Sequence, residues 1–208
     1  MKFAGTRARR AAVITVAVLA VLVAVVAFFP WNALRGVVAS AVSARLHRTV
    51  TIEHLAVDLG WTTRVRIEGV TIANAEWSQT QPMATLPTTL LTFSIPSLFR
   101  LSPDAVHAVK PQILLERSGS GEANWKFGED GKSGAFVGAI DFEDGRVRYV
   151  DPTLRADINL SITGANSGQV PHLLQFKGGG TLRGESFSID GTSAGLSELR
   201  KIDDPYRL

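Results

Sequence analysis

An uninterrupted apolar stretch from Ala11 to Phe29 constrains this chain most, because Thr15 is the only polar side chain within it. A helix of that length covers roughly 28 Å, which is close to the roughly 30 Å thickness of the hydrocarbon core of a bilayer. A helix that is apolar on every side is unsuited to the surface of a soluble domain. We therefore predict a transmembrane helix over residues 11–29.

The residues before this stretch predict its orientation. Four basic side chains precede it, at Lys2, Arg7, Arg9 and Arg10. The positive-inside rule keeps such residues in the cytoplasm. Residues 1–10 are therefore predicted to be a cytoplasmic basic tail. The chain after residue 29 is predicted to be exported and to remain tethered to the membrane.

A cleaved signal peptide is the alternative interpretation, since it also combines a basic start with an apolar core. The apolar core here is longer than that of most signal peptides, and no small-residue cleavage site follows it. Instead it ends in Phe28, Phe29, Pro30 and Trp31. Aromatic side chains of this kind suit the membrane–water interface. The pattern favours an uncleaved anchor.

The charges are distributed unevenly along the chain. No acidic residue precedes Glu53, whereas the rest of the chain contains all 19 Asp and Glu. The basic character of the whole chain therefore belongs to its start, which argues against nucleic-acid binding by the folded domain. The chain contains no cysteine, which excludes disulfides, thiolate metal sites and cysteine nucleophiles.

Residues 30–48 are predicted to be a linker followed by a short amphipathic helix. Leu34, Val38 and Val42 recur at a spacing of four residues, and Asn32 is a suitable N-cap. Two arrangements are compatible with this pattern. The helix packs on its own domain, or it lies on the membrane surface with its arginines directed toward anionic lipid.

From residue 49 onward the apolar pattern changes to a period of two, which is typical of half-buried strands. The alternating groups are Val50/Ile52, Val65/Ile67, Val70/Ile72, Leu91/Phe93/Ile95, Ile113/Leu115, Ile158/Leu160/Ile162, Leu174/Phe176 and Phe187/Ile189. Glu68-Gly69 interrupts the alternation and predicts a bulge or bend. Residues 73–85 and 118–134 are predicted loops, and Trp125 indicates that the second loop folds back. The expected fold is mainly β, an antiparallel meander that forms a curved sheet with one apolar face.

Two turns are predicted within this meander. Asp144-Gly145 is a type I′ dipeptide, which predicts a hairpin over residues 140–149. That hairpin would pair Glu143 with Arg146, Phe142 with Val147, Asp141 with Arg148 and Ile140 with Tyr149. A second turn is predicted at Gly184-Glu185.

The sequence contains no pattern of residues that predicts a catalytic or metal-binding site. The acidic residues Asp141, Glu143 and Asp144 do not match a calcium loop, and the predicted hairpin accounts for their charges. His47, His54, His107 and His172 are dispersed, and no cysteine completes a zinc set. The triplet Gly178–Gly180 leads into a strand rather than a helix, so it does not predict a phosphate-binding loop. We expect no catalytic activity, no cofactor and no metal.

The chain resembles the AsmA family of bacterial envelope proteins. The resemblance rests on the order of several segments. They are the anchor, Trp31-Asn32, Arg48–Leu55, Asp58–Trp61, Val65–Asn74, Glu76-Trp77, Pro111–Glu116, Gly121–Trp125, Ile140–Tyr149 and Asp151-Pro152. It implies an inner-membrane anchor, residues 49–208 as a periplasmic AsmA-like β-domain, and a role in outer-membrane assembly. Because family members usually continue through many more strands, this domain is expected to be incomplete relative to the family.

The resemblance also implies lipid transfer, since related proteins are understood to hold acyl chains in the groove of a curved sheet. The candidate lining residues are Val65, Ile67, Leu91, Phe93, Ile113, Leu115, Phe142, Val147, Leu160 and Ile162. An ordinary protein core is the alternative role for each of them. The leading hypothesis is a non-catalytic protein that handles phospholipid during outer-membrane biogenesis. The alternative hypothesis is a structural protein that docks on envelope partners without transferring lipid.

Overall fold

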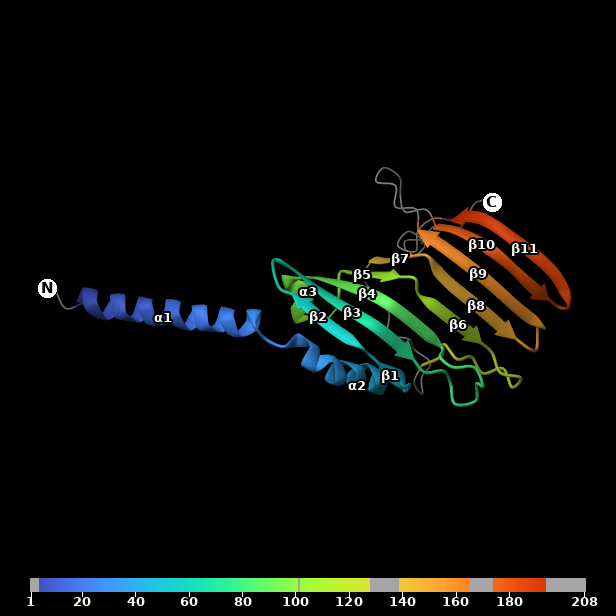
Figure 1. The fold of residues 1–208 in the computed structure, drawn as a ribbon, viewed down its shortest axis with the longest axis horizontal. Coiled ribbons are helices and arrows are strands. Elements are labelled where there is room, and N and C mark those ends of the chain that lie inside the picture. The colour runs from blue at the N-terminus through green and yellow to red at the C-terminus, as the bar shows by residue number, and fades with distance from the viewer. Residues whose placement is uncertain (1–3, 101, 128–138, 165–173, 194–208) are drawn as a thin grey trace. The chain divides into compact units, whose positions relative to one another are not determined.

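The computed structural model describes residues 4–100, 102–127, 139–164 and 174–193 (Figure 1). The chain divides into two compact units, residues 1–31 and residues 32–208. The predicted amphipathic helix therefore belongs to the same unit as the sheet.

The first unit contains the helix α1 (Ala4–Ala27). After it, the amide of Phe28 donates to the carbonyl of Ala24, and the rings of Phe29 and Trp31 meet edge to face at 4.9 Å. Within the described residues, no helix satisfies the combined length and hydropathy requirement for crossing a membrane. The predicted transmembrane assignment of residues 11–29 is therefore without structural support.

The second unit begins within the 3-10 turn η1 (Trp31–Leu34), which is followed by the helix α2 (Arg35–Leu46). The predicted cap is wrong, because Leu34 occupies the N-cap position and makes no side-chain hydrogen bond there. The Asn32 side chain instead accepts a hydrogen bond from the amide of Leu55, at 3.0 Å. No described side chain of α2 is fully buried, and Val37 is well exposed. The helix is attached to the sheet by polar contacts, including Val50 N–H to Ser43 Oγ at 2.8 Å.

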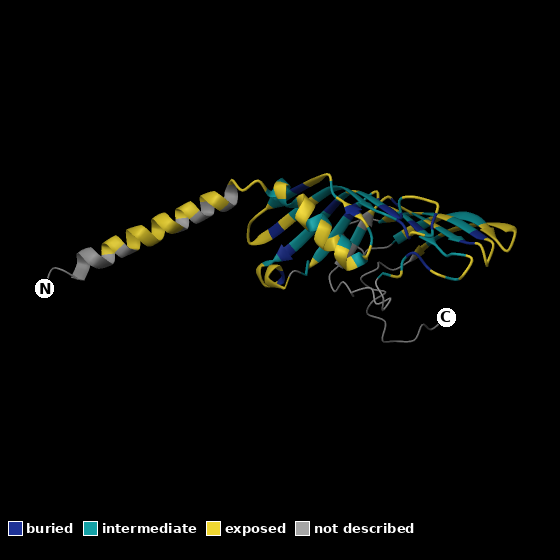
Figure 2. Ribbon diagram, turned by 90° about the horizontal axis from the view of Figure 1, so that it is seen from below, coloured by how far each residue is buried: buried dark blue, intermediate teal, exposed yellow. Residues whose placement is uncertain are grey.

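One curved, open sheet contains all the strands (Figures 1 and 2). The strands are β1 (Val50–Thr51), β2 (His54–Asp58), β3 (Thr62–Ile72), β4 (Ala84–Ser94), β5 (Ala105–Val109), β6 (Gln112–Glu116), β7 (Ala139–Glu143), β8 (Gly145–Asp151), β9 (Ala156–Gly164), β10 (Leu174–Leu182) and β11 (Glu185–Ser193). A short helix, α3 (Ile95–Phe99), follows β4. The predicted strand thus ends before Ile95, because Pro96 suits the first turn of a helix.

The sheet is mixed, so the prediction of an antiparallel meander is wrong in one place. β5 pairs with β7 in parallel, and β6 pairs with β8 in parallel, whereas the other pairings are antiparallel. The predicted hairpin over residues 140–149 does not form. Asp144 has a φ of 53°, but Gly145 does not adopt a positive φ, so the chain continues from β7 into β8 without reversing. A type I′ turn requires both residues in the left-handed region.

A line of backbone irregularities crosses the sheet. When the registers of the flanking pairs are continued, Gly69 of β3 and Pro87 of β4 fall in line with Glu53 between β1 and β2, Lys110 between β5 and β6, and Asp144 between β7 and β8. We call these five positions the kink line. Gly69, Lys110 and Asp144 have φ values of 63°, 51° and 53°. The predicted bend at Glu68-Gly69 is therefore confirmed, and it is one part of a feature that spans these five positions.

The kink line shifts by one residue the alternation of side chains between the two faces of the sheet. Positions that share a face therefore change between even and odd numbers along the chain. The amide of Lys110 donates to the carbonyl of Glu143, so even-numbered residues of β5 direct their backbone groups toward β7. The amide of Arg146 donates to the carbonyl of Pro111, so odd-numbered residues of β6 direct theirs toward β8. Because backbone direction and side-chain direction are coupled in L-residues, even positions of β5 and odd positions of β6 share one face.

The last hairpin differs from its prediction by one residue. Leu182 pairs with Glu185, so the two-residue turn is Arg183-Gly184, with φ values of 56° and 90°. Gly178–Gly180 lie inside β10 rather than before a strand. A Cβ atom on Gly178 would lie 2.0 Å from the carbonyl oxygen of Asn159 on β9. The glycine therefore allows close approach of two strands.

Candidate lipid-binding face of the sheet

The sheet places nine of the ten predicted lining residues on one face. Val65 pairs with Leu91, which pairs with Val106 of β5. Across the kink line, Ile113 pairs with Val147, which pairs with Leu160. The shifted alternation joins these two rows. We call the face that carries them the apolar face; its candidate members are Val65, Ile67, Leu91, Phe93, Ile113, Leu115, Val147, Leu160 and Ile162.

The tenth candidate, Phe142, lies in β7, but its side chain is outside the described part of the structure. Of the nine described candidates, only Phe93 is buried, and the other eight are half-buried. Figure 2 shows this intermediate burial along most of the described sheet. Half-buried side chains of this size leave apolar surface in contact with solvent, and that surface gains free energy when an apolar partner covers it.

Further apolar residues extend the same face beyond the predicted set. Tyr149 pairs with Leu115 and with Ile158, and Phe176 pairs with Ile162. On β11, Ile189 pairs with Gly178 and is 40% exposed. The period-two pattern contains the signal for Phe176 and Ile189, whose neighbours in sequence are polar, whereas Tyr149 is followed by Val150.

The described start of the loop after β6 folds back onto the sheet, as its tryptophan predicted. The ring of Trp125 lies 6.0 Å from that of Tyr149, and the Arg117 guanidinium lies 5.7 Å from the Trp125 ring. Arg117 also approaches Asp151, with Nε 3.4 Å from Oδ2. These contacts fix the described start of the loop, and residues 128–134 of the prediction lie outside the described range.

A buried polar cluster ties that loop to the loop between β3 and β4. The fully buried Asn124 amide donates to Asn74 Oδ1 at 2.9 Å and to the Leu114 carbonyl at 2.8 Å. Asn124 Oδ1 accepts from the amide of Glu116. Ser78 donates its hydroxyl to the Glu116 carboxylate at 2.5 Å. The cluster joins both loops to β6 and thereby fixes one border of the apolar face.

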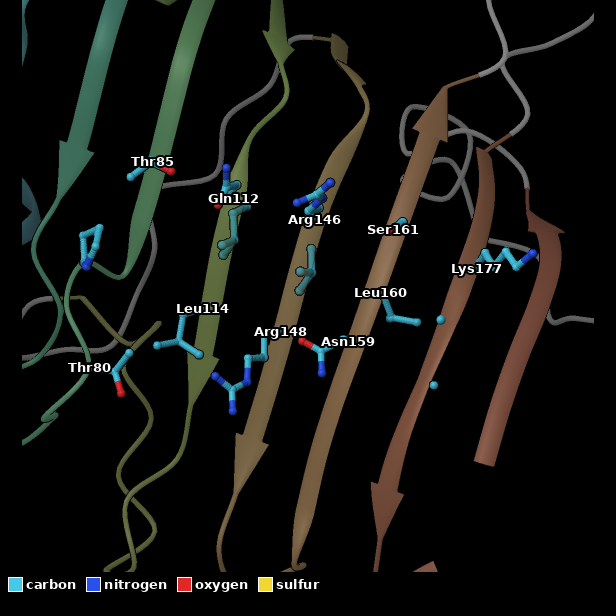
Figure 3. A pocket seen from close by; sticks show the side chains of 15 residues that line it. Thr80, Thr85, Gln112, Leu114, Arg146, Arg148, Asn159, Leu160, Ser161 and Lys177 are labelled. Carbon is cyan, nitrogen blue, oxygen red and sulfur yellow. The ribbon is translucent and has the colours of Figure 1, made fainter. Parts of the chain in front are cut away.

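The opposite face of the sheet is polar, and a depression lies on it (Figure 3). Its lining combines Gln112, Arg146, Arg148, Asn159, Ser161 and Lys177 with Leu114, and the intervening positions Ile113, Val147 and Leu160 of the apolar face also border it. Arg148 and Asp157 form a two-point ion pair at 2.9 and 2.8 Å. The hydrogen bond from Arg148 lowers the pKa of the Asp157 carboxyl. The depression therefore combines charged and amide groups with apolar side chains.

The acidic residues of the segment that was predicted to form a hairpin have different partners from those predicted. Asp141 lies opposite His107 on β5, with Oδ2 3.1 Å from Nδ1, and Glu143 Oε2 lies 4.0 Å from Nε2 of the same ring. The predicted pairings with Arg148 and Arg146 are wrong, because β7 and β8 do not fold back on each other. Over the described ranges, no group of three or more His, Asp or Glu side chains has an arrangement that could hold a metal ion.

Comparison with known proteins supplies one match. No curated protein and no solved structure matches the chain. The family model of the AsmA family matches residues 6–134, a range that includes most of α1, all of α2 and the strands β1 to β6. This range covers more than half of the sequence and includes the buried Asn74–Asn124 cluster. The chain therefore belongs to the AsmA family.

Proposed function

We propose that this protein is a non-catalytic, phospholipid-handling component of the bacterial envelope, in which the apolar face of the sheet holds acyl chains. The observation that carries the proposal is a continuous row of half-buried aliphatic and aromatic side chains on an open sheet. Apolar area of this kind is stabilised by about 25 cal/mol per Å² when it is removed from water. Membership of the AsmA family is consistent with an envelope or lipid-related role.

The proposal includes attachment to the inner membrane, with the sheet in the periplasm. It rests on the apolar sequence from Ala11 to Phe29, on the basic residues before it and on the aromatic residues after it. Extraction of cell membranes with alkaline carbonate tests the attachment. An integral protein stays in the pellet, and recovery of the chain in the supernatant would contradict this part of the proposal.

Two adjacent residues of β9 provide a matched test of lipid contact. Leu160 lies on the apolar face, and the exposed Ser161 lies on the polar face. A photoreactive benzoylphenylalanine at each position, in the full chain in cells, should yield a phospholipid adduct at 160 and little or none at 161. Mass spectrometry of the irradiated protein identifies the adduct. Equal adducts at both positions, or none at 160, would overturn the acyl-chain proposal.

The alternative function is docking on an envelope protein, and the outermost described strand favours it. β11 pairs only with β10 within the described part of the chain, and it exposes Phe187 and Ile189. A strand edge with exposed apolar residues can accept a strand from a partner. A stoichiometric protein adduct from a photoreactive residue at 189, together with no lipid adduct at 160, would favour this alternative.

A further inference from the structure

One end of the sheet carries a cluster of exposed apolar side chains. The turn between β2 and β3 lies beside α3, because Thr62 at the start of β3 pairs with Ser94 at the end of β4 (Figure 1). We call this cluster the apolar tip; its members are Leu59, Trp61, Ile95, Leu98 and Phe99. Trp61 is 89% exposed and Phe99 is 85% exposed. Large aromatic side chains that are both clustered and exposed to solvent indicate a contact surface.

The apolar tip is held in place by a specific set of hydrogen bonds. The hydroxyl of the buried Ser97 in α3 donates to Asp104 Oδ2 at 2.7 Å, and the amide of Ser94 donates to the same oxygen. These bonds, that of the Ser97 hydroxyl first, lower the pKa of Asp104. Asp104 thus fixes α3 against the start of β5. The aromatic residues of the tip are presented by an anchored helix and a tight turn.

Charge around the apolar tip is nearly balanced. On one side, Arg64 lies directly opposite Asp58 on the neighbouring strand. On the other side, Arg100 at the end of α3 acts electrostatically on Asp104. This balance does not favour a partner that binds through opposite charge. The partner that fits is one that accepts aromatic and aliphatic side chains, and the interfacial layer of a bilayer accepts tryptophan and phenylalanine in this way.

The length of the connecting chain limits how far the apolar tip can lie from the end of the apolar sequence. Phe29 precedes Asn32 by three residues, so the two lie within about 11 Å of each other along the chain. The Asn32 side chain binds the amide of Leu55 in β2. The strand continues from Leu55 to the tip residue Leu59, a path of about 13 Å. A membrane that holds the apolar sequence is therefore within reach of the tip.

We propose that the apolar tip inserts into the interfacial layer of a phospholipid bilayer and seats this end of the sheet on the membrane. The inference rests on the membrane attachment in the proposed function, and it adds a second contact. That contact would place the edge of the apolar face, at Phe93 and Thr63, next to the lipid. Insertion is driven by apolar burial, so it is expected to withstand high salt.

Spin labels on the full chain test this contact, since the sequence contains no native cysteine. Single cysteines at Trp61, at Phe99 and at the exposed Leu154 in the turn between β8 and β9 are labelled after reconstitution into vesicles of phosphatidylethanolamine and phosphatidylglycerol. Collision with a water-soluble nickel complex should be several-fold weaker at 61 and 99 than at 154, in low and in high salt. Quenching of the unlabelled chain by brominated lipids, compared with Trp61→Phe, gives a second measurement without a label.

Each result decides the proposal. Equal nickel accessibility at all three positions, with no loss of quenching in Trp61→Phe, would overturn it. Shielding at 61 that comes with spin–spin coupling between copies would also overturn it, in favour of contact with a second copy of the chain. The photoadduct at position 160 is measured separately, so lipid holding by the sheet can stand or fall independently of the tip.

Discussion

Polar side chains are among the most buried of the described structure. The largest fully buried side chains among the described residues are Asn124, Asp151 and Ser97, whereas several of the buried apolar residues are alanines. A single sheet without a second sheet among its described elements offers little volume for a core of large apolar residues. Stability at individual residues therefore depends on satisfied hydrogen bonds, since a buried polar group without a partner is costly.

Replacement of Asn124 by alanine should weaken the protein markedly. The change leaves the amide of Glu116 and the carbonyl of Leu114 without their partner in a buried site. A loss of roughly 1–3 kcal/mol in the free energy of unfolding is expected for such groups. Urea denaturation followed by tryptophan fluorescence measures it, with the exposed Asn159→Ala as the control. Similar midpoints for the two variants would contradict the role given to the cluster.

Asp151 should contribute stability that disappears in acid. The amides of Leu154 and Thr153 and the hydroxyl of Tyr149 donate to its carboxylate, at 3.0, 2.9 and 3.0 Å. The hydrogen bond from the amide of Leu154 is the largest influence that lowers the pKa of Asp151. A lowered pKa stabilises the folded state above the pKa of the unfolded chain, and the contribution is lost as the pH falls below about 4.

The variant Asp151→Asn isolates this effect. Denaturation between about pH 6 and pH 3 should show a steeper loss of stability for the native chain than for the variant, whose side chain does not titrate. Asp157→Asn is the control, because the Asp157 side chain is 44% exposed and its ion pair is screened by solvent. Parallel pH curves for the native chain and Asp151→Asn would refute the assignment.

At the level of strands and turns, local sequence signals predicted backbone conformation better than chain direction. Asp144-Gly145 correctly indicated a positive φ at Asp144. The same signal predicts a reversal, although the chain continues into a parallel pairing. Parallel pairing depends on residues more than 30 positions apart in sequence, so a two-residue turn pattern has no information about it. At Arg183-Gly184 the opposite holds, because the reversal is real and the signal was displaced by one residue.

Gly69 should be the least replaceable residue of the kink line. An alanine there must adopt a φ near 63°, and its Cβ would lie 2.4 Å from the side chain of Glu53. The left-handed conformation costs about 1–2 kcal/mol for a residue with a Cβ. Gly69→Ala combined with Glu53→Ala removes the contact and leaves the conformational cost. Gly69→Ala should therefore lower the free energy of unfolding by less in the Glu53→Ala background than in the native chain. An equal loss in both backgrounds would show that the crowding at Glu53 is relieved without cost.

At the scale of the whole molecule, the apolar alternation carried most of the information. It placed nine lining residues that the structure brings to one face, because a period of two selects one side of a strand. It could not reveal the parallel crossover or the alignment of the five kink-line positions across the sheet. Those features arise from pairing between distant segments, and Pro87 or Lys110 by itself does not distinguish a kink from a turn. Within the Ala123–Trp125 segment, Trp125 predicts that the loop folds back, whereas only the resemblance points to Asn124, whose buried amide has a structural role.

A single charge in the middle of the apolar face should decide whether that face holds lipid. Leu115 lies in β6, between β4 and β8 in the sheet order, and is half-buried on the apolar face. Gln112, in the same strand, is exposed on the polar face. Leu115→Glu should reduce the phospholipid that co-purifies with the full chain in mild detergent several-fold, because a carboxylate is costly beside acyl chains. Gln112→Glu should leave it unchanged. Native mass spectrometry counts the bound lipid, and circular dichroism checks that both variants keep the sheet. If the two folded variants retain equal lipid, the acyl chains do not lie on this face.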